Sequence, residues 1–212
     1  MTLDVRLLAI AGPPVVDLAR LVEQCRSAEA GGVTALQVRV KDVPAQELLR
    51  LTERLVETVR VPVYVNDRAD VAWAAGAAGV HLGADDVPPA AIRRAAAPPF
   101  RIGVSVGTPA EASVMRHADV DYWSIGSVFA TTTKPDAGRP IGVAGFTDLA
   151  RAAPEGMPVI AIGGITPDNA AAVFAAGAAG IAVSSAVFGA SDVEARAAAL
   201  RKVVDAAIGS RR

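Results

Sequence analysis

The sequence predicts an α/β fold, a single-domain (β/α)8 barrel of the TIM type that spans residues 1–212. Short runs rich in Val and Ile recur eight times along the chain, bounded by Gly, Pro or Asn. Such runs are typical of strands buried on both faces in a parallel sheet. Segments with helical spacing lie between them, and about eight strand–helix units fit the length of a small barrel. The expected strands cover residues 5–12, 33–40, 61–66, 78–83, 100–106, 120–126, 157–164 and 179–185.

An internal repeat supports this fold. "AAGAAGVHLG" at 74–83 resembles "AAGAAGIAVS" at 175–184, and in both copies the glycines fall at element boundaries. Repeated strand–helix units produce this pattern. Convergent low complexity in an alanine-rich chain is the alternative interpretation.

Helices are expected between the strands. Residues 15–32 have apolar side chains near helical spacing and end in Gly-Gly, a common helix stop. Residues 44–59 begin with a proline, which suits a first turn, and carry apolar side chains down one face. Asp168 and Asp192 each precede an alanine-rich segment, so we expect each acid to stand at a helix N-terminus.

Composition excludes several classes of protein. The net charge is −1, which lacks the basic excess expected of a nucleic-acid binder. Cys25 is the only cysteine, so an intrachain disulfide is excluded, and this fits a reducing cytosol. The N-terminal run carries Asp4 and does not resemble a signal peptide, and glycine, proline or charge interrupts each apolar run before it reaches membrane-span length. We therefore expect a cytoplasmic protein without membrane or nucleic-acid partners.

The second expected strand ends in cations. In "QVRVKD", Gln37, Arg39 and Lys41 alternate with valines, so the three side chains should share one face of the strand. The inward face near a strand's C-terminal end opens on the active site in barrels of this kind. Two cations and an amide there predict a polyanion site. The alternative is an exposed strand end whose cations pair with Asp42 or Glu47.

Carboxylates follow the next two strands. Asn66 and Asp67 come after the third strand, and Asp85 and Asp86 come after the fourth, just before a proline. An acid from each loop could share one Mg2+, which is held by one or two carboxylates with water and phosphate oxygens. Helix capping is the alternative for the third-strand pair. His81, within the fourth strand, is interpreted as a barrel-lining side chain rather than a metal ligand.

The remaining strand ends predict positioning and phosphate-binding groups. Ser105 has no obviously placed histidine to activate it, so we interpret it as a positioning residue. The "IGGIT" loop with Gly164, beside Ser184 and Ser185, matches the phosphate cradle that barrels form after strands 7 and 8. One cationic strand end, one metal site and one separate cradle favour a reaction between two phosphorylated substrates.

The chain resembles the thiamine-phosphate synthase family over nearly its whole length. The resemblance rests on "QVRVKD", "VNDRADVA", "GVHLGADD", "GVSVGT", "DYWSIGSVFATTTK" and "VIAIGGITPDN" in this order. It implies a transferase of thiamine biosynthesis that joins a pyrimidine methyl diphosphate to a thiazole phosphate, with early Mg2+-assisted release of pyrophosphate. The partners of this protein would then be small molecules, a phosphorylated pyrimidine and a phosphorylated thiazole.

The resemblance also implies residue roles. Asp67 and Asp86 would ligate Mg2+, the cofactor. The side chains that would hold the pyrimidine diphosphate are Gln37, Arg39, Lys41, Asn66, Ser105 and Lys134. Of these, Arg39, Lys41, Ser105 and Lys134 are the candidate catalytic residues. The thiazole phosphate would be bound by Thr131, Thr132, Thr133, Gly164, Ser184 and Ser185. Residues 135–142 would cover the reactants.

The chain departs from the family pattern at Ala84, Gly107 and Ser127, where Gln, His and Pro are usual. A related thiazole tautomerase relies on that histidine, so Gly107 and the retained acids favour the synthase. A non-catalytic binder of thiamine precursors and a different phosphate-binding barrel are further alternatives. The sequence leaves open whether the protein forms a homo-oligomer.

Overall fold

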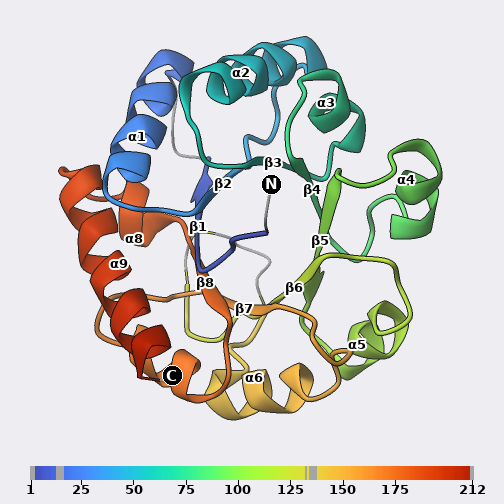
Figure 1. Cartoon of the computed structure of the whole chain (residues 1–212), viewed down its shortest axis with the longest axis vertical. Coiled ribbons are helices and arrows are strands. Elements are labelled where there is room, and N and C mark those ends of the chain that lie inside the picture. Colours follow the sequence, from blue (N-terminus) through green and yellow to red (C-terminus); the bar gives the residue numbers. More distant parts are fainter. Residues whose placement is uncertain (1–2, 13–16, 132, 134–137, 211–212) are drawn as a thin grey trace.

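Eight parallel strands close into a barrel with helices packed around it (Figure 1). The computed structural model describes residues 3–12, 17–131, 133 and 138–210. The strands are β1 (Leu7–Ala11), β2 (Ala35–Val38), β3 (Val63–Asn66), β4 (Gly79–Leu82), β5 (Arg101–Val106), β6 (Tyr122–Ile125), β7 (Val159–Ile162) and β8 (Gly180–Val183). The helices in these ranges are α1 (Leu18–Ala30), α2 (Ala45–Thr58), α3 (Ala69–Ala74), α4 (Pro89–Ala95), α5 (Pro109–Met115), α6 (Gly142–Ala150), α7 (Ala170–Ala175), α8 (Ser185–Phe188) and α9 (Val193–Gly209).

Each expected strand contains an observed one, so the (β/α)8 prediction is confirmed. The observed strands are shorter at most of their ends. For β2 the difference matters, because the strand stops at Val38 and Arg39 and Lys41 lie in the loop beyond it. The prediction that both cations share a strand face with Gln37 was therefore wrong. Past Val38 the chain leaves the ladder, although the Arg39 N–H still donates to the Ala11 carbonyl (2.7 Å).

Local sequence explains where the helices begin. Asp17 caps α1, and its carboxylate accepts hydrogen bonds from the N–H groups of Ala19 and Arg20. Asp192 caps α9 in the same way, as expected, by accepting from the N–H of Ala195 (2.9 Å). Among the described helices, none is both long enough and apolar enough to cross a membrane.

Asp168 does not stand at a helix start, which corrects that prediction. The helix α7 begins at Ala170, and its N-terminal flanking residue is Asn169. The Asn169 side chain is used in the preceding turn, where it accepts from the Thr166 N–H (2.9 Å) and donates to the Gly164 carbonyl (2.9 Å). Because these bonds hold a turn, the helix starts later than the acid suggests.

The barrel interior is filled by its own small core. Leu8, Tyr64, Tyr122 and Ile160 belong to this inner cluster and are almost fully buried. The rings of Tyr64 and Tyr122 meet edge to face with centroids 5.8 Å apart. Gly103 makes room for the Tyr122 ring, because a Cβ there would lie 2.1 Å from it. A separate, larger apolar core lies between strands and helices. Within the described part of the barrel, side chains therefore fill the interior at the aromatic layer, and the pocket described below lies at the C-terminal ends of the strands.

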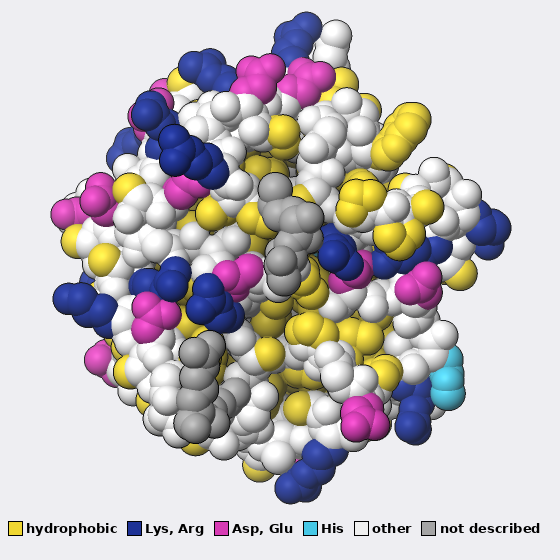
Figure 2. Space-filling view, in the orientation of Figure 1, with side chains coloured by type: hydrophobic (Ala, Val, Ile, Leu, Met, Phe, Trp, Pro, Cys, Tyr) yellow, Lys and Arg dark blue, Asp and Glu magenta, His cyan; other side chains and the backbone are white. Residues whose placement is uncertain are grey.

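The end of the barrel where the strands begin is held by ion pairs. The Asp121 carboxylate pairs with Arg93 and with Arg101, the latter at 2.6 Å, and it also accepts from the Ile102 N–H (2.8 Å). Figure 2 shows this end, where side chains of both charges surround the centre of the face. The carboxylate is mostly buried and every oxygen has a cationic or N–H partner, so the network fixes β5 against β6.

Candidate active site

The inward side chains at the C-terminal ends of the strands form the floor of the site. The floor is polar on one side and apolar on the other. The polar side runs through Gln37, Asn66, His81, Ser105 and Ser124, which follow one another on β2 to β6. The apolar side consists of Ile10, Ile162 and Ala182 on β1, β7 and β8. A flat ring with one polar edge would match such a floor.

Hydrogen bonds link neighbouring strands across the polar side. The Gln37 side-chain N–H donates to Asn66 Oδ1 at 2.8 Å. Because Asn66 is held by Gln37, its side chain is not a helix cap, and α3 has no side-chain cap bond at all. Side chains at the C-terminal ends of β2 and β3 are thus tied together before any ligand binds.

His81 joins three strands through its ring. Its Nδ1 lies 3.0 Å from the Tyr122 hydroxyl and its Nε2 lies 3.0 Å from Ser105 Oγ. The prediction of a barrel-lining histidine is confirmed, but the expectation that Ser105 has no histidine beside it was wrong. The contact depends on the β4–β5–β6 register, which spacing along the chain does not reveal. Burial raises the pKa of Tyr122 well above its ordinary value, so its hydroxyl stays neutral.

The two expected metal-binding carboxylates lie side by side. Asp67 follows β3 in a left-handed backbone conformation (φ 63°), and its N–H donates to the His81 carbonyl (2.8 Å). Asp86 Oδ2 accepts from the Gly83 N–H (2.6 Å), which folds the loop after β4 back toward the strand end. The helix α4 has no side-chain cap bond, so Asp86 does not serve as its cap.

Their proximity shows in the pKa of Asp67, which rises from 3.8 to about 6. The largest cause is partial burial, followed by the hydrogen bond and charge repulsion from Asp86. Lys41 and Arg39 act in the opposite direction, so both cations lie close enough to this carboxylate to be felt by it. Among the described residues, neither cation forms an ion pair with Asp42 or Glu47, so the alternative pairing is not observed.

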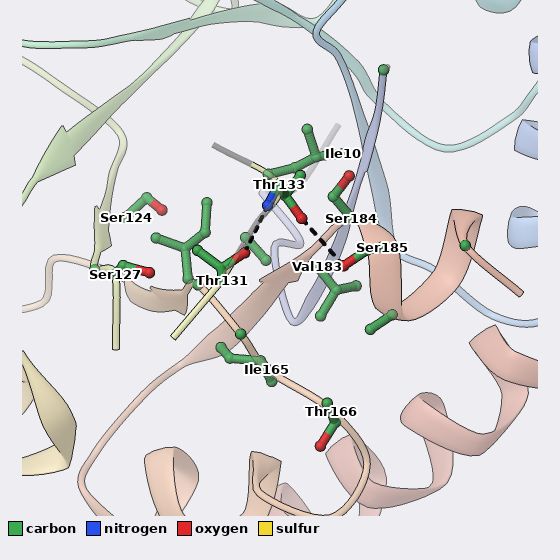
Figure 3. Close-up of a pocket in the computed structure, with 18 of the residues that line it drawn as sticks. Ile10, Ser124, Ser127, Thr131, Thr133, Ile165, Thr166, Val183, Ser184 and Ser185 are labelled. Atoms are coloured by element: carbon green, nitrogen blue, oxygen red, sulfur yellow. Dashed lines mark hydrogen bonds between the residues drawn. The ribbon is translucent and has the colours of Figure 1, made fainter. Parts of the chain in front are cut away.

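A pocket of about 690 Å³ opens beside this cluster. Its walls are the loops after β6, β7 and β8 (Figure 3). Arg39, from the loop after β2, also lines it. Thr133 Oγ1 donates to Ser185 Oγ at 3.2 Å, and the Thr133 N–H donates to Thr131 Oγ1 at 3.2 Å. The threonine loop therefore contacts the start of α8 directly.

Gly164 allows two of these loops to pack closely. Its φ is +62°, and a Cβ there would lie 2.3 Å from the Ala130 carbonyl oxygen. Ser184 and Ser185 complete this wall, and the first N–H groups of α8 lack intrahelical acceptors, as at every helix start. The structure thus brings Thr131, Thr133, Gly164, Ser184 and Ser185 together. Thr132, Lys134 and residues 135–137 lie outside the described residues.

Comparisons with known proteins agree with this geometry. The family model described as thiamine monophosphate synthase matches residues 7–187. The chain belongs to this family. It is similar to the thiamine-phosphate synthases of Moorella thermoacetica (47% identity, 89% of this chain and 90% of that one) and Roseiflexus castenholzii (48% identity, 85% and 79%). A solved thiamine phosphate pyrophosphorylase from Pyrococcus furiosus has a TM-score of 0.85 and 39% identity, covering 97% of this chain and 98% of its own.

The pocket of this thiamine monophosphate synthase family member also contains polar residues that the sequence reasoning did not name, among them Ser124 and Arg196. Ser124 is inside β6 and lines the pocket, and the alternation Tyr122, Ser124 could have placed it on the inner face. Arg196 lines the pocket from α9. No pattern in the sequence signals it, because α9 reaches the site only through the closure of the barrel.

Proposed function

We propose that this chain is a thiamine-phosphate synthase. It would join 4-amino-2-methyl-5-(diphosphooxymethyl)pyrimidine to a thiazole phosphate, giving thiamine phosphate and pyrophosphate. Family membership supports this proposal, and one structural observation supports it most: Arg39 lines a pocket walled by the phosphate-cradle loops, and Arg39, Lys41 and Asp86 all lie close enough to Asp67 to shift its pKa. That combination suits a diphosphate leaving group on one side and a second phosphorylated substrate on the other.

The residues present fit a magnesium ion. Asp67 and Asp86 are close enough for the charge of one to raise the pKa of the other, and a shared divalent cation would relieve that repulsion. The described residues contain no group of three or more His, Cys, Asp or Glu side chains suited to a metal, and Mg2+ needs only one or two carboxylates when phosphate and water complete its shell. When bound, Mg2+ would neutralise charge on the diphosphate oxygens.

The chain's own cations would hold and stabilise the leaving group. Arg39 would bind diphosphate oxygens through its planar fork, and Lys41 would add a point charge at the exposed edge. As the carbon–oxygen bond of the pyrimidine methyl diphosphate breaks, negative charge grows on the pyrophosphate, and fixed positive groups stabilise it. We keep Lys134 as a third proposed cation on the resemblance alone.

Gln37, Asn66 and Ser105 would position the pyrimidine. Their side chains belong to the polar side of the floor, where Gln37 bonds Asn66 and His81 bonds Ser105. Ser105 is proposed as a positioning residue rather than a nucleophile, because the other ring nitrogen of His81 beside it lies against the Tyr122 phenol, where a catalytic triad places a carboxylate. The thiazole nitrogen would supply the attacking electron pair, so no protein nucleophile is required.

The thiazole phosphate would lie in the cradle between the loops after β6, β7 and β8. Thr131, Thr133 and Ser185 offer hydroxyls there, while the turn at Gly164 and the start of α8 offer backbone N–H groups. Thr132 remains a proposed member of this set. Placing the second substrate across the pocket from the diphosphate brings the thiazole nitrogen toward the carbon that loses pyrophosphate. A cytoplasmic location and a homo-oligomeric state remain predictions.

A coupling assay tests the proposal. Purified protein is incubated with both phosphorylated precursors and Mg2+, and both products are quantified. Equal amounts of thiamine phosphate and pyrophosphate are expected. Tautomerisation of the thiazole without coupling would instead identify a tautomerase-like protein. Tight binding of both precursors without any turnover would identify a non-catalytic binder.

A further inference from the structure

One hydroxyl on the floor of the pocket has no partner. Ser124 is 1% exposed, and its Oγ forms no hydrogen bond within the described part of the chain. Among the side chains that the structure describes, two other buried polar atoms share this condition, Gln24 Oε1 and Trp123 Nε1, but neither residue lines the pocket. Buried hydroxyls are costly to leave unpaired, so an unpaired one that faces a ligand pocket indicates a ligand contact.

The polar side chains nearest to Ser124 are bonded to His81 and form no hydrogen bond with Ser124. Ser105 is its register partner on β5, and Ser105 Oγ is engaged with His81 Nε2 at 3.0 Å. Below it on the same strand face, the Tyr122 hydroxyl is engaged with His81 Nδ1. Figure 3 shows Ser124 at the side of the pocket away from the Thr133–Ser185 contact. Ser124 therefore ends the polar side of the floor with its hydrogen-bonding capacity unused.

We propose that the Ser124 hydroxyl forms a hydrogen bond with the nitrogen-bearing edge of the aminopyrimidine and so helps select that ring. This inference rests on the proposed function. A serine hydroxyl can donate to a ring nitrogen or accept from an exocyclic amine, and the pyrimidine offers both. The thiazole is the less suitable partner, because its nitrogen must keep its electron pair free to attack the pyrimidine carbon.

Hydrogen-bonding groups for the pyrimidine ring lie at two separate places on the floor of the pocket. Gln37 and Asn66, joined at 2.8 Å, lie on β2 and β3, while Ser105 and Ser124 lie on β5 and β6. A ring over this polar side would meet hydrogen-bonding groups at opposite ends of one edge, while its other edge faces Ile162 and Ala182. Ser124 is therefore assigned as a positioning residue for the pyrimidine.

The test uses Ser124→Ala with Ser127→Ala as a matched control. Ser127 is another buried serine of the same segment, but its hydroxyl donates to the Phe129 carbonyl at 3.0 Å. Ser127→Ala should lower the Tm of the ligand-free protein, because it removes a made bond. Ser124→Ala should leave that Tm unchanged or raise it, because the lost hydroxyl had no protein partner.

Binding is measured as inhibition constants of two non-reacting pyrophosphonates, one carrying the aminopyrimidine and one carrying a phenyl ring. Ser124→Ala should weaken binding of the aminopyrimidine compound about tenfold, which is the scale of one neutral hydrogen bond. Binding of the phenyl compound should weaken by less than about twofold. In the coupling assay, the KM for thiazole phosphate should not change. Ser124→Cys keeps a weak donor of similar shape, so its inhibition constant for the aminopyrimidine compound should lie between those of wild type and Ser124→Ala.

Equal weakening of both inhibitors, or a change confined to the KM for thiazole phosphate, would overturn the inference. So would a Tm loss in Ser124→Ala equal to that in Ser127→Ala together with unchanged inhibition, since Ser124 would then be a packing residue. The inhibition arm does not depend on turnover. If wild type forms no thiamine phosphate yet prefers the aminopyrimidine inhibitor through Ser124, the proposed function fails while the ring contact stands.

Discussion

The two ends of this barrel treat buried polar groups in opposite ways. Where the strands begin, Asp121 is held between Arg93 and Arg101 and also receives a backbone N–H. Where the strands end, Asp67 faces a second carboxylate, its pKa is raised to about 6, and the Ser124 hydroxyl has no partner. At the first end the protein itself supplies partners for the buried carboxylate, whereas at the second the proposed function assigns that part to a cation and a substrate. This contrast separates a face built for stability from one built for binding.

Arg39→Ala should show the largest effect and should act only on the strand-end face. Removing a fixed cation from the leaving group is expected to lower kcat/KM about 10²–10³-fold, as for the loss of one transition-state donor. The Tm should change little, because the Arg39 side chain forms no described ion pair. Steady-state kinetics and thermal melts measure the two quantities. Arg26→Ala, at an exposed pair on α1, is the control and should match wild type in both.

Asp121→Ala should produce the reverse pattern. The substitution removes a mostly buried carboxylate that two arginines share. We expect it to lower the free energy of unfolding by about 3 kcal/mol. Urea unfolding measures this change. At a temperature where the variant is folded, its kcat should equal that of wild type. A strong loss of kcat with normal stability would mean that the two ends are not functionally separate.

Asp67→Asn should stabilise the metal-free protein while removing activity. The folded-state pKa of Asp67 lies above its ordinary value, so the folded state binds the proton more tightly than the unfolded one. Wild-type stability therefore falls as pH rises from 3.8 to about 6, and the full penalty remains above that window. The variant's Tm should exceed that of wild type at pH 7 by a few degrees, with solvent screening keeping the gain small.

The pH and metal dependence of that difference sharpen the comparison. Below pH 3.8 the wild-type carboxyl is protonated in both states, so the two melting curves should converge. Adding Mg2+ at pH 7 should raise the Tm of wild type more than that of Asp67→Asn. If Asp67→Asn melted below wild type at pH 7 without metal, the ionised Asp67 carboxylate would not be destabilised by burial and by Asp86, contrary to this account.

Lys41→Ala should give the smallest effect. Lys41 is exposed in the loop after β2, where water and salt weaken its field. We expect a loss of about tenfold or less in kcat/KM, shrinking further as ionic strength rises, because the wild-type contribution is screened. A loss as large as that of Arg39→Ala at high salt would show that Lys41 closes onto the diphosphate when substrate binds.

Much of the site followed from the sequence because parallel strands deliver their C-terminal loops to one face. That rule placed Asp67 beside Asp86, and Gly164 beside Ser185, from residues far apart along the chain. To apply this rule, only the sequence positions of the strands are needed, because consecutive strands are neighbours in the barrel. The short Val- and Ile-rich runs mark those positions.

The remainder depended on register, strand ends and side-chain competition. The Ser105–His81 contact requires the stagger between neighbouring strands, which periodicity alone leaves undetermined. The alternation through Arg39 and Lys41 looked like a continuing strand, but β2 ends at Val38. Asp168 looked like a cap, but Asn169 already holds the turn before α7.

The central claim is that the carboxylate pair binds the Mg2+ that assists release of pyrophosphate. Asp86→Asn tests it most directly, because the amide keeps an oxygen acceptor for the Gly83 N–H while losing the charge. Coupling rates of wild type and variant are measured across a Mg2+ titration at pH 7.5. The account predicts that the variant needs far more Mg2+ for half-maximal rate and stays slower at saturation. Identical rates for the two proteins at limiting Mg2+ would contradict it.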